Sequence, residues 1–154
     1  GNEGTFTDPR DGNVYKTVEI NGRIWLAENL RFEGVKHFAP NGNENNIAEY
    51  GCLYEWEDAM EACPEDWHLP SKEELTNVLN GEYLFEKLAL LQIKPAGTEN
   101  GNYFGTQCFL WSQTLEEETK SRGKALWALC TGIKTNSIGS YNEAFRFSVR
   151  CIKD

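Results

Sequence analysis

The sequence predicts a single domain of the α+β class. Two observations support this: segments with strand-like alternation lie at both ends of the chain, and two amphipathic helical segments lie between them. With 154 residues, 40% of them apolar, the chain has the size of one ordinary domain and can bury its own core. We expect residues 1–154 to form one unit. The start at Gly1 rather than Met indicates processing, with residues 1–4 as a remnant of it or of a tether.

A β-hairpin is expected near the start of the chain. The apolar residues of its first strand recur with period two and are expected on one face: Val14, Val18 and Ile20. Asn21-Gly22 supplies two residues suited to a tight turn, so residues 23–26 form the returning strand. Residues 31–49 show no sustained period and are rich in Asn, which predicts a long surface loop.

Helices are expected in the middle of the chain. The first would begin near Tyr50 and end at Pro64, with one apolar stripe formed by Leu53, Trp56, Met60 and Cys63. The second begins at Ser71, because Ser followed three residues later by Glu74 is the pattern of a capping box. Its buried face would be Leu75, Val78 and Leu79. A short third helix is expected at residues 83–90.

The second half predicts strands separated by turns, at residues 91–95, 108–114, 124–130 and 144–152. Residues 116–120, EEETK, are expected to form a solvated loop. In the last strand, alternation places one set of residues on the apolar side: Phe145, Phe147, Val149 and Cys151. The opposite set would face away from it: Arg146, Ser148, Arg150 and Ile152.

Five cysteines with no CxxC pair favour disulfides over a zinc site, and disulfides favour an exported, oxidising compartment. Cys63 and Cys151 are both predicted to face the core and can therefore meet. If they pair, the long loop that they close is worth about 4 kcal/mol in the chain-entropy account. Cys108 and Cys130 are open to a second, cross-strand pair. Because five is odd, at least one thiol stays free.

The charge of the chain excludes two classes of partner. The net charge is -9 and the basic residues are scattered, so a nucleic acid or an anionic membrane surface would find no basic patch. No run of about 18 apolar residues occurs, so no transmembrane segment is expected.

Several segments resemble the Fibrobacter succinogenes major paralogous domain, a family of exported bacterial modules often found on surface lipoproteins. They are TFTDPRDGNVYKTVEINGRIWLAENL, YGCLYEWEDAMEACPEDWHLPSKEEL, LWSQT and FRFSVRCIKD. The resemblance implies the fold related to C-type lectins and the formylglycine-generating enzyme: two main helices packed on a short, mostly antiparallel sheet with long loops. It also implies a disulfide between the first helix and the last strand, at Cys63 and Cys151. The implied location is the outer cell surface or periplasm, with a lipid anchor in the precursor.

Enzymatic chemistry is disfavoured by the residues themselves. Formylglycine-generating enzymes bind a metal through two cysteines five residues apart, but the position five before Cys151 is Arg146. His68 could act as a general base near neutral pH, yet no nucleophile motif accompanies it, so a hydrogen-bonded structural role is expected instead. We therefore expect no enzyme activity and no catalytic residue.

A calcium-dependent lectin site is also disfavoured. Calcium needs six to eight oxygen ligands, and the chain has Trp127-Ala128-Leu129 where sugar-binding C-type lectins have a Trp-Asn-Asp motif. Glu99 and Asn100 lie in a loop without the proline typical of such lectins. The Asn-rich residues 41–46 carry one carboxylate and are expected to form turns. We expect no metal and no cofactor.

The remaining candidates are aromatic, amide and acidic residues of the loops, a composition suited to a glycan or protein ligand. They are Glu99, Asn100, Asn102, Tyr103, Phe104, Asn136, Tyr141, Asn142 and Glu143. The sequence thus predicts a non-enzymatic, exported recognition or adhesion module. The alternatives are a degenerate or novel enzyme of the formylglycine-generating type and a structural spacer of a surface lipoprotein.

Overall fold

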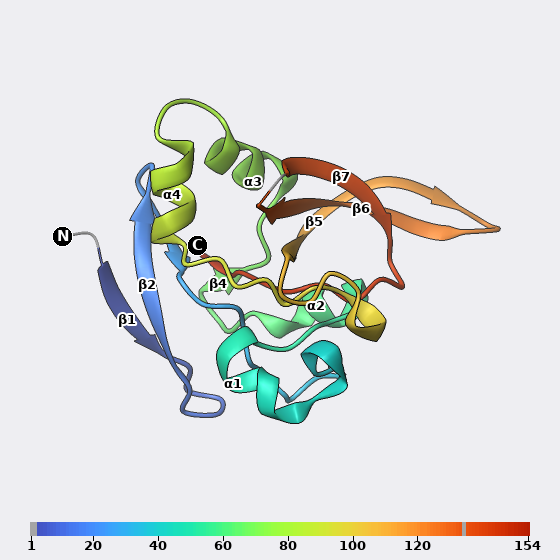
Figure 1. The fold of residues 1–154 in the computed structure, drawn as a ribbon, viewed down its shortest axis with the longest axis horizontal. Helices are drawn as coiled ribbons and strands as arrows, with labels where there is room; N and C mark the ends of the chain where they lie inside the picture. The colour runs from blue at the N-terminus through green and yellow to red at the C-terminus, as the bar shows by residue number, and fades with distance from the viewer. Residues whose placement is uncertain (1–2, 134) are drawn as a thin grey trace.

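The chain folds into two antiparallel sheets and four short α-helices within the residues that the structure describes (Figure 1). This structure is a computed structural model, and it describes residues 3–133 and 135–154. One sheet has the strand order β1-β2-β3-β8-β4, and the other has the order β5-β6-β7. The fold class is therefore α+β, as the sequence predicts.

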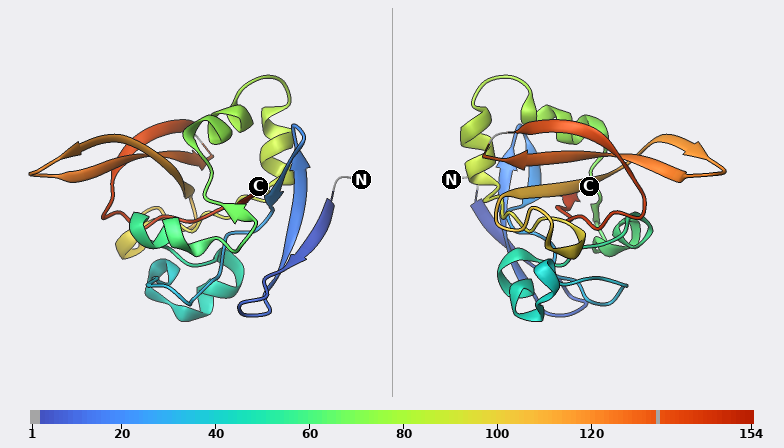
Figure 2. Two further views of the ribbon diagram at one scale, coloured as in Figure 1. Left: turned by 180° about the vertical axis from the view of Figure 1, so that it is seen from behind. Right: turned by 45° about the vertical axis from the view of Figure 1, so that its right-hand side comes forward.

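The strands are β1 Glu3–Thr7, β2 Val14–Ile20, β3 Arg23–Leu26, β4 Trp67–His68, β5 Gln107–Thr119, β6 Gly123–Gly132, β7 Asn136–Asn142 and β8 Ile152–Lys153. The helices are α1 Ile47–Tyr50, α2 Trp56–Ala62, α3 Lys72–Leu79 and α4 Leu84–Leu90, and single 3-10 turns lie at η1 Pro40–Gly42, η2 Glu44–Asn46 and η3 Glu99–Gly101. The far end of the hairpin formed by β5 and β6, residues 115–126, extends as an arm beyond the rest of the molecule (Figures 1 and 2). No helix in the described ranges is long and apolar enough to cross a membrane.

The N-terminal hairpin is confirmed. β2 and β3 pair antiparallel, and the turn residues Asn21 and Gly22 have φ values of 52° and 79°, which a tight hairpin turn requires. Val14 is a correction, because it is 53% exposed while its neighbour Tyr15 is buried. Only the second half of β2 buries the predicted face. Of residues 1–4, Glu3 and Gly4 belong to β1, and residues 1–2 lie outside the described residues.

The first predicted helix is shorter than expected. Gly51, with φ 77°, ends α1, and Leu53 and Tyr54 are extended because they pair with Phe38 and Phe147. Helix α2 therefore begins only at Trp56 and buries Ala59 and Ala62. Met60, predicted on the buried stripe, is 43% exposed. The predicted surface loop at residues 31–49 contains η1, η2 and most of α1.

The second and third helices agree with the prediction. Ser71 accepts a hydrogen bond from the backbone of Glu74, whose carboxylate in turn accepts from the backbone of Ser71, which completes the capping box of α3. Leu75 and Val78 are buried and Leu79 is half-buried. Helix α4 occupies the predicted third segment.

Two predictions for the second half are wrong, and one strand was missed. Residues 91–95 form no strand: Gln92 has φ 49°, and the chain turns there. Residues 116–120 are not a loop, because β5 continues to Thr119 along the arm. Strand β7 was not predicted, since its sequence, NSIGSYN, has little of the apolar alternation that marks a strand.

The last segment was predicted as one alternating strand and departs from it. It contacts other segments through single bridges at Phe147 and Ser148 and forms only the two residues of β8. Ser148, Arg150 and Ile152, predicted to face away from the core, are all fully buried. Phe145, predicted in the core, is 37% exposed. This segment runs between packed layers, so both of its sides are covered.

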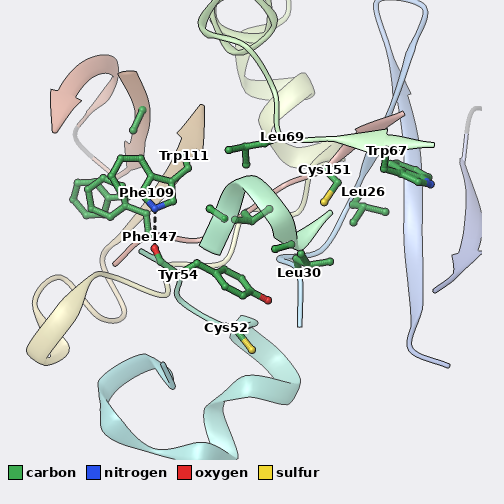
Figure 3. Packing of buried hydrophobic residues seen from close by; sticks show 14 of the residues in the cluster. Leu26, Leu30, Cys52, Tyr54, Trp67, Leu69, Phe109, Trp111, Phe147 and Cys151 are labelled. Atoms are coloured by element: carbon green, nitrogen blue, oxygen red, sulfur yellow. Dashed lines mark hydrogen bonds between the residues drawn. The ribbon is translucent and has the colours of Figure 1, made fainter. Parts of the chain in front are cut away.

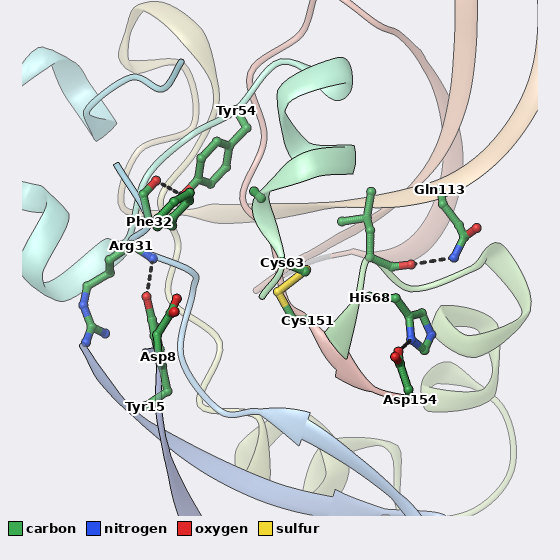
Figure 4. Close-up of a disulfide and its surroundings, with 12 residues drawn as sticks. Asp8, Tyr15, Arg31, Phe32, Tyr54, Cys63, His68, Gln113, Cys151 and Asp154 are labelled. Atoms are coloured by element: carbon green, nitrogen blue, oxygen red, sulfur yellow. Dashed lines mark hydrogen bonds and ion pairs between the residues drawn. A yellow bond between two sulfur atoms is a disulfide. The ribbon is translucent and has the colours of Figure 1, made fainter. Parts of the chain in front are cut away.

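The cysteines form one disulfide within the described residues, between Cys63 and Cys151 (Figure 4). Cys108 and Cys130 are not bonded to each other. Cys130 pairs in register with Phe109, the neighbour of Cys108, so the two thiols point to opposite faces of the sheet. They consequently belong to two different core clusters.

Candidate recognition surface

A cluster of aromatic rings covers one face of the sheet β5-β6-β7. Its buried floor is formed by Phe109 and Phe147, which stack with centroids 4.8 Å apart. Trp111 lies beside Phe147 at 4.4 Å and donates its indole N–H to the carbonyl of Tyr54 (Figure 3). Pairs of rings at these separations add to the burial of their area, so the floor is a rigid support.

Three further rings lie on this floor and reach the surface. Tyr103 is 55% exposed and lies 5.7 Å from Phe109. Tyr141 is half-buried, with its ring edge-on to Phe147 at 5.1 Å. Phe145 is stacked on Phe147 at 5.6 Å. We call Tyr103, Tyr141 and Phe145 the aromatic face.

The loop that carries Tyr103 is fixed by its own backbone. The Asn102 carbonyl accepts from the N–H of Thr98, and the Tyr103 carbonyl accepts from the N–H of Gln107. Gly97 packs so closely on this loop that a Cβ atom there would collide with the Asn102 carbonyl. Tyr103 itself has φ 61°, an uncommon conformation for an aromatic residue. The ring is thus positioned before any ligand arrives, which lowers the entropy cost of binding.

Some half-buried rings of the molecule are covered by cations, and the aromatic face is not. Arg146 lies 3.5 Å above the ring of Phe38, and Lys72 lies 3.7 Å above that of Trp127. Within residues 3–133 and 135–154, no cation lies over Tyr103, Tyr141 or Phe145, and neither phenol hydroxyl has a hydrogen-bond partner. Both the ring faces and the hydroxyls are therefore available to a ligand.

The pKa of Tyr141 is raised, first by burial and then by the nearby Cys130 thiol and the Tyr103 phenol. Its hydroxyl therefore stays protonated at neutral pH and can donate a hydrogen bond. Gly139 lies under this ring, since a Cβ atom there would come within 3.1 Å of it. The absence of a side chain at Gly139 lets the Tyr141 ring lie flat over the strand.

The structure brings some of the predicted residues to the aromatic face. Glu99, Asn100 and Asn102 belong to the same loop as Tyr103, and both amide residues are exposed. The Glu99 carboxylate accepts hydrogen bonds from the Thr98 hydroxyl and from the backbone N–H of Arg146. This carboxylate therefore holds the loop beside the final segment.

Other predicted residues make contacts within the protein instead. Asn136 lies at the far end of β7 from Tyr141, and its side-chain oxygen accepts from the Thr131 hydroxyl. The Asn142 side chain bonds the Arg122 carbonyl and the Ala144 N–H. Glu143 accepts from the backbone N–H of Lys124. Phe104 is half-buried against Tyr50, with centroids 4.9 Å apart. The sequence predicted Phe145 to lie in the core, so its exposure on this face was not foreseen.

His68 lies at a charged corner on another side of the molecule. Its Nδ1 is 2.7 Å from Asp154 Oδ1, and its Nε2 is 2.9 Å from Glu74 Oε1 (Figure 4). Arg23 completes the corner through an ion pair with Glu74 at 2.8 Å. These contacts join β3, β4 and α3 to the C-terminal segment. The arrangement is that of a scaffold, with the imidazole held at both nitrogens.

The pKa of Glu74 gives this corner a dependence on pH. Burial raises it, but hydrogen bonds from Ser71 and His68 and the charges of His68 and Arg23 outweigh burial, so the pKa is lowered from 4.5. A lowered pKa means that Glu74 stabilises the fold above its unfolded pKa and that this contribution is lost as the pH falls through its folded pKa.

We predict that Glu74→Gln lowers the urea midpoint at pH 7 and that its difference from the parent shrinks towards pH 3, because protonation of Glu74 removes its charge. Urea unfolding at both pH values measures this. Glu73→Gln, an exposed carboxylate one residue earlier on α3, is the control and should change the midpoint much less. A difference that is equal at the two pH values would contradict the assignment.

No group of three or more His, Cys, Asp or Glu side chains within the described residues is arranged to hold a metal ion. Cys151, the residue that would correspond to a metal ligand of the formylglycine-generating enzymes, is in the disulfide.

A groove of about 570 Å³ was not predicted from the sequence. It lies between α4 and the ends of the sheet β5-β6-β7, and its apolar lining includes Phe85, Leu88, Ile93, Pro95 and Ile133. Phe85 is 75% exposed and Ile133 is 90% exposed. The sequence held one signal of this groove: Phe85, an aromatic residue on the outer side of a short helix.

The comparisons with known proteins give one match. Residues 18–90 match the family model described as the Fibrobacter succinogenes major domain, which supports the resemblance for the segment from β2 to the end of α4. No curated protein matches the chain, and no solved structure matches it.

Proposed function

We propose that this chain is a non-enzymatic recognition module that binds its ligand through the aromatic face, with a glycan as the first candidate. The observation that carries the proposal is a rigid set of surface rings, Tyr103, Tyr141 and Phe145, without covering cations and with unpaired phenol hydroxyls. A sugar ring offers an apolar C–H face to such rings and hydroxyls to the phenols and to the amides of Asn100 and Asn102.

The frame that we propose for this surface is C-type-lectin-like. Two features support it: a disulfide that joins the end of α2 to the final segment, and long connections that carry the exposed rings. The match of residues 18–90 to the Fibrobacter succinogenes major domain is a separate support for the family.

Export to the outer surface or periplasm, with a lipid anchor in the precursor, is part of the same proposal. Disulfides persist in oxidising compartments and are rare where thiols are kept reduced. The Cys63–Cys151 bond therefore supports export. The proposal of export does not depend on the nature of the ligand.

Two other functions stand as alternatives. An enzyme of the formylglycine-generating type would need a thiolate pair, and here Cys151 is in the disulfide while Arg146 lies over Phe38. A structural spacer would need no ligand at all. The uncovered rings favour recognition over a spacer, because a spacer gains nothing from unpaired aromatic surface.

The test is a glycan array probed with the purified chain, once with calcium and once with a chelator. We expect a saturable glycan that binds equally in both conditions. Tyr103→Ala and Tyr141→Ala should each weaken its binding about tenfold, as measured by calorimetry. Phe85→Ala removes a more exposed ring from α4 and is the control, with unchanged affinity expected.

The other outcomes separate the alternatives. Binding that is lost with the chelator would indicate a calcium site and contradict the proposed mode. Unchanged affinity in both tyrosine variants would place the ligand elsewhere. If the glycan array is empty, a surface-protein array tests a protein ligand, and a second empty array favours the spacer.

A further inference from the structure

Strand β7 lies along the free edge of its sheet (Figures 1 and 2). Just beyond one end of β7, Glu143 donates its N–H to the Lys124 carbonyl. Just before the other end, the Thr135 carbonyl accepts from the N–H of Gly132. Because antiparallel pairs alternate, odd-numbered residues of β7 bond to β6 and even-numbered residues direct their N–H and C=O groups outwards. The outward residues are Asn136, Ile138, Ser140 and Asn142, and of these the Asn142 carbonyl accepts from the N–H of Phe145.

The outward groups from Asn136 to Ser140 are unpaired and unprotected. No group in residues 3–133 or 135–154 bonds to the N–H or C=O of Asn136, Ile138 or Ser140. Proteins usually guard such an edge with charge, proline, a bulge or a covering segment. β7 has neither charge nor proline, and its register with β6 shows no shift.

The opposite edge of the same sheet shows the usual protection. Along β5, the carbonyl of Gln107 accepts from Gly97, and the N–H of Trp111 donates to Ser148. The arm beyond carries three consecutive glutamates at residues 116–118 and two register shifts. Within one sheet, therefore, one edge is covered and charged, while the other has unpaired main-chain groups from Asn136 to Ser140.

We propose that β7 is a docking edge for a second copy of this chain, with two β7 strands paired antiparallel about a two-fold axis at Gly139. In this register Ile138 of each copy exchanges both main-chain hydrogen bonds with Ser140 of the other. Gly139 then faces its own copy as a non-hydrogen-bonded pair, in which the Cα atoms approach to about 4.5 Å. A glycine suits this closest point of approach.

One flank of β7 adds an apolar contact. Ile133, between β6 and β7, is 90% exposed. A two-fold axis at Gly139 brings the Ile133 end of each copy to the Asn142 end of the other. The same contact is thus made twice, which is the self-complementarity that a two-fold interface needs.

Charge favours this edge over the rest of the surface. Each chain has a net charge of -9, so two copies repel each other at low salt. The side chains of β7 are uncharged, so no like charges lie directly opposite each other in the paired strands; the Glu116 carboxylate that accepts from the Ser140 hydroxyl belongs to β5. Pairing uses the open edge of both copies, so the assembly stops at the dimer.

The test is sedimentation velocity of the 154-residue chain over a concentration series. We expect a monomer–dimer equilibrium with a dissociation constant of about 10–100 μM, typical of a small interface. Added salt should strengthen the dimer by screening the repulsion of the two chains. Ser140→Pro removes an outward N–H, which an edge strand tolerates, and should weaken dimerisation at least about tenfold.

Two variants control this experiment. Ser140→Ala loses the same side chain but keeps the N–H, so its dimer should persist. Ile133→Asp leaves the strand intact and should weaken the dimer through the flank alone. Near-ultraviolet circular dichroism verifies that each variant is folded. A monomer at every concentration, or a dimer that neither Ser140→Pro nor Ile133→Asp weakens, would overturn the proposal.

Discussion

Replacing Arg150 with Met is expected to lower the free energy of unfolding by about 3 kcal/mol or more. The Arg150 guanidinium is fully buried, and it donates Nε to the Asn29 side chain at 2.8 Å. Its remaining nitrogens bond the carbonyls of Leu26, Leu91 and Gln92. A methionine fills much of the same volume but leaves these acceptors unpaired in the core, and each unpaired buried acceptor costs about 1–3 kcal/mol.

Burial lowers the pKa of Arg150 to about 10, so the side chain is still charged at neutral pH. Its partners are neutral oxygens from two other segments of the chain, residues 26–29 and 91–92. The guanidinium therefore joins β3, the turn after α4 and the final segment. Lysine cannot reproduce this planar arrangement of donors, so we expect Arg150→Lys to be destabilising as well.

Urea unfolding monitored by tryptophan fluorescence measures the effect. The matched control is Arg122→Met, an exposed arginine near the tip of the arm, for which a change within about 0.5 kcal/mol is expected. An Arg150→Met variant as stable as the parent would show that water reaches these carbonyls and that the hydrogen bonds of Arg150 contribute nothing to stability.

Local signals in the sequence predicted the elements that depend on local interactions. The Asn21-Gly22 turn fixes its own hairpin, and the Ser71–Glu74 capping box fixes the start of α3. These features need only a few neighbouring residues. They could be predicted because no distant contact competes with them.

Non-local contacts explain the errors. Leu53 matched a helical stripe, but its pairing with Phe38 holds it extended. Arg150 and Ser148 alternate with apolar residues and so predicted an exposed side. They are buried because their partners come from segments far away in the sequence. A pattern of polarity cannot reveal that such partners exist.

The candidate site was predictable in its chemistry and less so in its geometry. Tyr103 and Tyr141 were singled out as aromatic loop residues, and the structure brings both onto Phe109. Asn136 and Asn142 have the same chemistry, but Asn136 accepts from the Thr131 hydroxyl and Asn142 donates to the Arg122 carbonyl. Because β7 itself was not predicted, nothing in the sequence placed Tyr141 on a strand beside the Tyr103 loop.

Removing the disulfide is expected to have an effect as large as the loss of Arg150. Cys63 and Cys151 are 88 residues apart, and a loop of that length restricts the unfolded chain by about 4 kcal/mol in the chain-entropy account. Cys151 is fully buried, and the loop encloses α3, α4 and the sheet β5-β6-β7. Cys63→Ala with Cys151→Ala should therefore lower the unfolding free energy by about 4 kcal/mol.

Urea unfolding of the parent and of this double variant, each with and without reductant, isolates the contribution of the bond. The parent should lose most of the difference once it is reduced, whereas the double variant should not respond, since Cys52, Cys108 and Cys130 are free thiols in both proteins. If the fully reduced parent unfolds at its original midpoint, the stabilisation comes from packing around Cys151 rather than from loop closure. Because a cytosolic chain would meet the reduced condition throughout its life, a loss of about 4 kcal/mol, out of the 5–15 kcal/mol typical of domains, would tie folding to an oxidising compartment.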